Sequence, residues 1–197
     1  MSFLIALARM IDALNERIGL WVSWALLAAV LICSGNALTR YTFNMSSNGW
    51  LEIQWYLFSA MFLLGASYTL RRNEHVRIDV IAGRFSKRTQ VRIDLFGFVF
   101  FMLPICLLIL YYSVPYAMIA YQSNEMSMNA GGLIMWPAKI LIPISFFLLS
   151  LQGFSEIIKR IGYLQGKVDA REFEKQVATP DEEIEAIKAI KAANKIA

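Results

Sequence analysis

Histidine and cysteine are scarce in this sequence, which contains one histidine and two cysteines among its 197 residues. The histidine, His75, lies in a charged connector, so no apolar segment offers the axial ligands that a haem between helices usually needs. Cys33 and Cys106 lie inside apolar segments, where we expect small buried residues and no disulfide. No cluster has the three or four ligands of a zinc site. No metal or other cofactor is therefore predicted.

Nucleotide-binding glycine motifs are also lacking. Gly131 and Gly132 stand alone, without a further glycine at the spacing of a P-loop or a dinucleotide fingerprint. The net charge is +4, but the basic residues flank apolar segments, where they indicate membrane topology. The sequence therefore predicts no nucleic-acid partner.

Charged residues make up 17% of the chain, against roughly a quarter in average soluble proteins, and hydrophobic residues make up 57%. The excess lies in four blocks, at about 18–38, 50–70, 95–120 and 137–158. Each block is long enough to cross a hydrocarbon layer of about 30 Å, and a segment in lipid must satisfy its backbone as a helix. The predicted fold is an all-α polytopic membrane protein, with four transmembrane helices in a domain over 18–160.

Two segments flank this domain. Residues 1–17 place apolar residues at three- and four-residue steps, which predicts an amphipathic helix on the inner membrane surface; the alternative is that they extend the first membrane helix. A second short surface helix is predicted within the connector 71–94. Residues 161–197 form a charged cytoplasmic tail.

The orientation follows from the basic residues. Lys and Arg number 17 in the N-terminal segment, the connector and the tail together, against two, Arg40 and Lys139, in the other two loops. Because cytoplasmic segments carry the excess of Lys and Arg, both termini are predicted to be cytoplasmic. Pro104 and Pro115 are expected to bend the third helix.

Glu52 lies close to the outer membrane surface, where a carboxylate is costly unless it faces water or a partner. Three interpretations remain open: a helix-end carboxylate at the interface, a pair with Arg40, or a pair with another subunit. The middle of all four blocks lacks charge, whereas ion-driven carriers normally have ionisable residues near mid-membrane. These features predict a supporting membrane subunit.

Five stretches of the sequence form a recognisable pattern: RYTF (40–43), WLEIQWYLF (50–58), LLGASYTL (63–70), NEHVRID (73–79) and NAGGLIMWP (129–137). In their order and spacing they resemble the small permease subunit of tripartite ATP-independent periplasmic (TRAP) transporters, over roughly residues 18–160. Residues 129–137 are similar to the branch often labelled mannitol/chloroaromatic-type.

The resemblance implies a bacterial inner-membrane subunit, not an enzyme, that works with a large permease subunit and a periplasmic substrate-binding protein. Such systems take up organic anions with a sodium gradient, and the small subunit is expected to brace the large one and to help dock the binding protein. It also implies two groups of motif positions. The outer group, Arg40, Glu52 and Trp55, would stabilise the bundle and the docking surface. The inner group, Arg71, His75, Arg77 and Asp79, would anchor the bundle at membrane lipid headgroups.

Two other functions remain open from the sequence. One is a membrane anchor subunit of another inner-membrane complex, redox or signalling, although the lack of histidine in the apolar segments weighs against a redox role. The other is a small autonomous carrier or channel, against which the uncharged middle segments weigh.

Overall fold

The computed structural model describes residues 2–44, 47–73, 85–169 and 172–173. Within these residues all regular structure is helical, apart from one isolated bridge between Met126 and Ile134, which confirms the all-α fold. The helices are α1 (Ser2–Phe43), α2 (Asn48–Arg71), α4 (Lys87–Gly97), the π-helical turn η1 (Phe98–Met102), α5 (Leu103–Gln122), α6 (Trp136–Lys139) and α7 (Leu141–Leu164).

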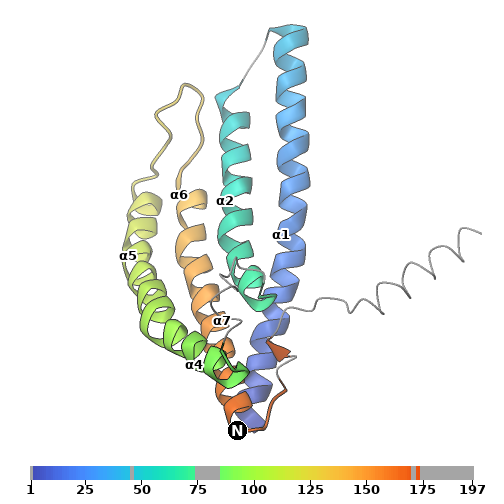
Figure 1. Cartoon of the computed structure of the whole chain (residues 1–197). Helices are drawn as coiled ribbons and strands as arrows, with labels where there is room; N and C mark the ends of the chain where they lie inside the picture. Colours follow the sequence, from blue (N-terminus) through green and yellow to red (C-terminus); the bar gives the residue numbers. More distant parts are fainter. Residues whose placement is uncertain (1, 45–46, 74–84, 170–171, 174–197) are drawn as a thin grey trace, which may run out of the picture.

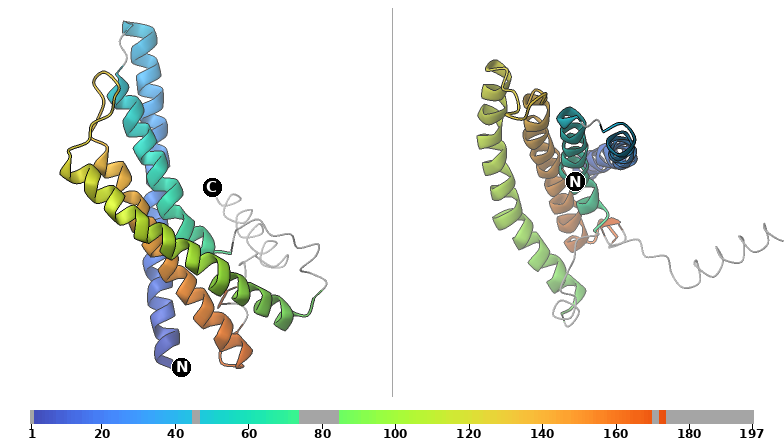
Figure 2. Two further views of the ribbon diagram at one scale, coloured as in Figure 1. Left: turned by 90° about the vertical axis from the view of Figure 1, so that its left-hand side faces the viewer. Right: turned by 90° about the horizontal axis from the view of Figure 1, so that it is seen from above.

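The long helices alternate in direction and lie side by side (Figure 1). Seen from above, they form a row in the order α5, α7, α2 and α1 (Figure 2). α7 is the central helix, since it contacts α1, α2 and α5. Along the direction of the helix axes, the start of α1 and the end of α7 lie at the same end of the array (Figure 1).

Three helical stretches of the described chain are long and apolar enough to cross a membrane: Phe3–Phe43, Lys87–Gln122 and Trp136–Leu164. The 24 residues of α2 would reach about 36 Å at about 1.5 Å per residue, but α2 is not among these three stretches. The fourth crossing, made by α2, therefore stays a prediction, as does the orientation of the array.

The surface of the array is rich in large apolar side chains, and several buried positions between helices hold small ones. Trp21, Trp24 and Tyr111 are among the exposed aromatic residues, whereas Ala29 and Ala120 are buried. Small residues between helices allow close approach in lipid, where exposed apolar side chains meet hydrocarbon or a partner and not water. The described helices thus have the surface of a membrane protein.

The N-terminal segment does not form a separate surface helix. α1 runs without a break from Ser2 to Phe43. The segment thus extends the first long helix, which is the alternative interpretation of residues 1–17. The physical reason is that its polar face meets α7, so that turning along the membrane surface would break buried contacts. Asn15 Nδ2 donates to Gln152 Oε1 at 2.7 Å, and Lys159 Nζ lies 3.0 Å from Asp12 Oδ2.

The third long helix begins directly after Ser86 and is helical from Lys87, whereas the membrane span predicted from the sequence begins at about residue 95. It changes to π-helical hydrogen bonding at Phe98–Met102, just before Pro104, and Pro115 lies inside α5. A proline has no N–H to donate to the preceding turn, and π-helical turns are common at helix bends. The helix is accordingly curved along α4, η1 and α5 (Figure 1).

Candidate functional site

Glu52 organises the outer end of the array. This residue is 6% exposed and lies near the start of α2. It accepts hydrogen bonds from Asn129 Nδ2 at 2.9 Å, from the backbone N–H of Leu133 at 2.6 Å and from the hydroxyl of Ser127. All three donors belong to the loop between α5 and α6. We call Glu52 and these donors the outer cluster; it fixes this loop on α2.

The same loop has further contacts with α2. Asn48 Nδ2 donates to the carbonyl oxygen of Ala130 at 2.9 Å, and the hydroxyl of Tyr56 donates to that of Ile134 at 2.7 Å. At the base of the loop, Lys139 Nζ lies 2.5 Å from Glu125 Oε2. A loop held at so many points offers a defined surface at this end of the molecule.

The loop requires glycine at two adjacent positions, for a different structural reason at each. Gly131 has a φ of +71°, a region that residues with a Cβ rarely adopt. At Gly132 an added Cβ would lie 2.6 Å from the Cβ of Ser127, which is one of the hydroxyl donors to Glu52. Glycine at this position therefore lets the loop close against the carboxylate.

The other two residues of the predicted outer group do not join Glu52. Arg40 is exposed in the last turn of α1 and does not pair with Glu52 in the described structure. Trp55 is 71% exposed on the surface of α2. Glu52 thus finds its partners within its own chain, in a loop that sequence reasoning did not connect with it.

A second set of polar side chains lies at the opposite end, between α1 and α7. We call it the inner cluster: Asp12, Asn15, Gln152, Ser155, Glu156, Lys159 and Arg160. Lys159 is 1% exposed, and its Nζ lies 2.5 Å from Glu156 Oε1 and 3.0 Å from Asp12 Oδ2. Asp12 also accepts hydrogen bonds from Ser155 Oγ at 2.7 Å and Gln152 Nε2 at 2.9 Å. Buried charges need such partners, because an unpaired one is very costly.

Arg160 connects the inner cluster with three other parts of the chain. It forms an ion pair with Glu156 and lies 3.4 Å from Asp94 of α4. Its guanidinium stacks between the rings of Phe98 and Phe173, at 4.5 and 5.1 Å from their centroids. Phe173 is 4% exposed, although it belongs to the segment after α7 that the sequence assigned to a charged tail. Phe173 of the predicted tail is thus packed against the rest of the chain.

The inner cluster was not recognised from the sequence, although a signal was present. Gln152, Ser155, Glu156 and Lys159 recur at three- and four-residue steps on α7, and Asp12 and Asn15 do so on α1. Two such polar faces, placed beside long apolar stretches, fit each other better than they fit lipid. The spacing alone could have suggested that α1 and α7 meet through these faces.

Arg71 is the one residue of the predicted inner group that the structure describes; His75, Arg77 and Asp79 lie outside the described residues. Arg71 and Arg72 both form ion pairs with Glu16 of α1, so they join two helices. Burial lowers the pKa of the Arg71 guanidinium from its ordinary value, and the negative charge of Asp12 acts in the opposite direction. An arginine starts from so high a pKa that it stays charged.

Neither cluster has the composition of a metal centre. No three side chains of His, Cys, Asp or Glu come together as a possible metal site in the part of the chain that the structure describes. The acidic groups of the inner cluster are instead balanced by Lys159 and Arg160. The contacts of the outer cluster join α2 to a loop, and those of the inner cluster join α1 to α7.

Residues 29–162 match the family described as tripartite ATP-independent periplasmic transporters, DctQ component. The matched region runs from within α1 almost to the end of α7 and includes Glu52 with its loop. Among curated proteins, none matches the chain.

Proposed function

The chain belongs to the DctQ component family of TRAP transporters, and we propose that it acts there as a passive brace for the large permease subunit. As a family member it is a small, multi-pass component of the inner membrane, and its family is one of transporter components and not of enzymes. In the proposed role it holds the large subunit in place and presents an outer surface on which the periplasmic binding protein docks.

The observation that carries the proposal is the position of the ionisable groups. Asp, Glu, Lys, Arg and His are absent from the ranges 18–39, 53–70, 95–124 and 140–155. The inner and outer clusters lie at the two ends of these ranges. Coupling an ion gradient to solute movement normally requires ionisable groups or broken helices deep in the membrane. A chain that lacks charges there is suited to support and not to coupling.

Two surfaces support the roles of brace and docking site. The outward sides of α1 and α5 expose large apolar side chains such as Trp24 and Tyr112, which a large membrane partner would cover. At the outer end, the loop fixed by Glu52 exposes Met126 and Met128. A fixed loop loses little conformational entropy when a partner binds, which favours docking.

The proposed transport cycle is the one that the family resemblance implies: sodium-driven uptake of an organic anion. The large subunit would hold the substrate and sodium sites, and the binding protein would select the substrate. This division of labour predicts that substitutions in the present chain change assembly or docking and leave substrate preference unchanged.

The test is reconstitution of the large permease subunit in vesicles, with the binding protein and a sodium gradient, in the presence or absence of this chain. Uptake of a labelled organic acid should require the chain. The Glu52→Ala variant should weaken docking of the binding protein and lower uptake at low binding-protein concentration. A companion variant, Arg40→Ala, tests a second member of the outer group. Wild-type assembly and uptake in both variants would remove the outer group from the proposal.

A further inference from the structure

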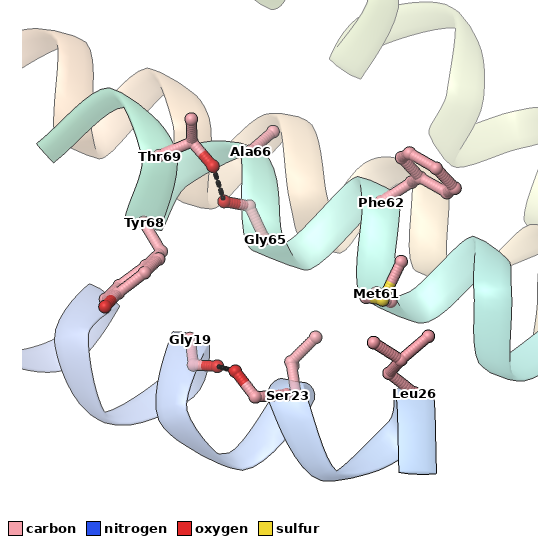
Figure 3. Close-up of a pocket in the computed structure, with 10 residues that line it drawn as sticks. Gly19, Ser23, Leu26, Met61, Phe62, Gly65, Ala66, Tyr68 and Thr69 are labelled. Carbon is pink, nitrogen blue, oxygen red and sulfur yellow. Dashed lines mark hydrogen bonds between the residues drawn. The ribbon is translucent and has the colours of Figure 1, made fainter. Parts of the chain in front are cut away.

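A groove of about 350 Å³ lies between α1 and α2, in the half of the array that ends at Arg71 and Arg72 (Figure 3). α1 contributes Gly19 and Leu26 to its lining, and α2 contributes Met61, Gly65 and Tyr68. The two helices touch where Gly19 meets Tyr68, since a Cβ on Gly19 would lie 2.4 Å from the tyrosine ring. The groove extends from this contact toward the middle of the helices.

The walls of the groove are mostly apolar, and the hydroxyl groups of Ser23 and Thr69 already have hydrogen-bond partners. Ser23 Oγ donates to the carbonyl oxygen of Gly19 at 2.9 Å, and Thr69 Oγ1 donates to that of Gly65 at 3.0 Å (Figure 3). A polar solute would lose its hydration here without gaining partners. A hydrocarbon chain loses nothing, so the lining favours an acyl chain.

One end of the groove carries positive charge. The guanidinium of Arg72 lies 5.3 Å from the centroid of the Tyr68 ring, which lines that end. Arg72 shares a single carboxylate, Glu16, with Arg71. The side chain of Arg72 is 37% exposed, so a headgroup can reach it. Arginine is well suited to phosphate, because its planar N–H groups match phosphate oxygens and keep their charge.

The distances fit one leaflet of a bilayer. The α2 residues that line the groove, from Met61 to Thr69, precede Arg72 by eleven to three residues. At about 1.5 Å per residue they lie roughly 4 to 16 Å from it along the helix axis. Half of a hydrocarbon layer of about 30 Å is about 15 Å. A lipid with its headgroup at Arg72 would therefore place one acyl chain along the whole groove.

We propose that the groove between α1 and α2 binds one acyl chain of an anionic phospholipid, with the headgroup phosphate at Arg72. In the predicted orientation this lipid belongs to the inner leaflet. The binding site is made by this chain alone, so it does not depend on the proposed role as a brace. The lipid fills a space that would otherwise separate the two helices at membrane depth.

The experiment uses the full chain in phosphatidylcholine vesicles that contain a trace of phosphatidylglycerol or phosphatidylcholine with a photoactivatable acyl chain. Cross-linked residues are located by mass spectrometry. We expect cross-links within 19–26 and 61–69, several-fold more with the anionic probe. Gly65→Leu should abolish them, because a Cβ on Gly65 has open space around it and the leucine fills the groove. Gly97→Leu, at another open glycine, is the matched control.

A second pair of variants tests the headgroup. Arg72→Gln should reduce the preference for the anionic probe, and Arg88→Gln, at an exposed arginine of α4, should not. Helical circular dichroism spectra like that of the wild type establish that each variant is folded.

Equal labelling of the Gly65→Leu and Gly97→Leu proteins would overturn the site, and equal labelling by both probes would overturn the phosphate contact. Loss of the cross-links on assembly with the large permease subunit would show that a partner helix occupies the groove, which also contradicts the proposal. Since the readout is labelling, its failure is separate from a failure of transport.

Discussion

Replacing Lys159 by methionine tests the inner cluster, because Lys159 is the cation shared by Asp12 of α1 and Glu156 of α7. Methionine keeps an unbranched apolar stem of four heavy atoms and removes the charged terminal nitrogen. Breaking a buried ion pair by removing one partner typically costs about 3–5 kcal/mol. We expect the lower end of this range, about 3 kcal/mol, since Asp12 keeps its hydrogen bonds from Ser155 and Gln152.

The assay is reversible unfolding in mixed micelles, followed by tryptophan fluorescence and circular dichroism. Lys167→Met removes an exposed lysine beyond α7 and serves as the control, with an expected change within about 0.5 kcal/mol. The double variant Asp12→Asn with Lys159→Met should be more stable than the sum of the single variants predicts, by about 1–3 kcal/mol, since residues in one network are coupled. Equal stability of the Lys159→Met and Lys167→Met proteins, or additive single effects, would refute the reasoning.

Three further predictions follow from the described contacts. Glu52→Ala removes the acceptor for Ser127 and the Leu133 N–H, so protease cleavage within the loop 125–133 should become faster in intact vesicles; an unchanged rate would contradict the role of Glu52. Phe173→Ala uncovers the guanidinium of Arg160, which should lower the unfolding midpoint relative to the wild type, and an unchanged midpoint would show that the tail contact is not used. Gly132→Ala places a Cβ against Ser127 and should mimic Glu52→Ala in the cleavage assay, whereas a wild-type rate would show that the loop can shift without loss.

The fold class and the family could be predicted from the sequence because both depend on local features. The length and apolarity of the segments require helices in lipid, and the stretches around Glu52 and Gly131 carry the family resemblance. The number of crossings and their orientation remain predictions from hydropathy and charge.

The partners of these residues could not be predicted, because they are distant in the chain. Glu52 was selected as an unusual carboxylate, but its donors lie 75 to 81 residues away. From the sequence, Asp12 belongs to the polar face of the amphipathic pattern in residues 1–17, which would be directed at water. Only the packing of α1 on α7 shows that Lys159 is its counterion. A carboxylate in an amphipathic pattern has the same local signal whether it meets water or a buried cation.

The two clusters together explain how a chain with uncharged middle segments keeps a defined arrangement. Packing between apolar helices in lipid gains little from the hydrophobic effect, since lipid tails are themselves apolar. Polar contacts at the ends, from Glu52 to the outer loop and from Asp12 to Lys159, supply directional interactions that set which helices are neighbours. The middle is thereby left as an apolar surface for lipid and for the large permease subunit.

The central claim, that this chain braces a transporter and does not itself move solute, is tested most directly by uptake into vesicles that contain the purified chain alone. With a sodium gradient and a labelled organic acid, the chain alone should show no uptake above empty vesicles, whereas vesicles with the large permease subunit, this chain and the binding protein should accumulate the acid. Gradient-dependent accumulation by the chain alone would contradict the account.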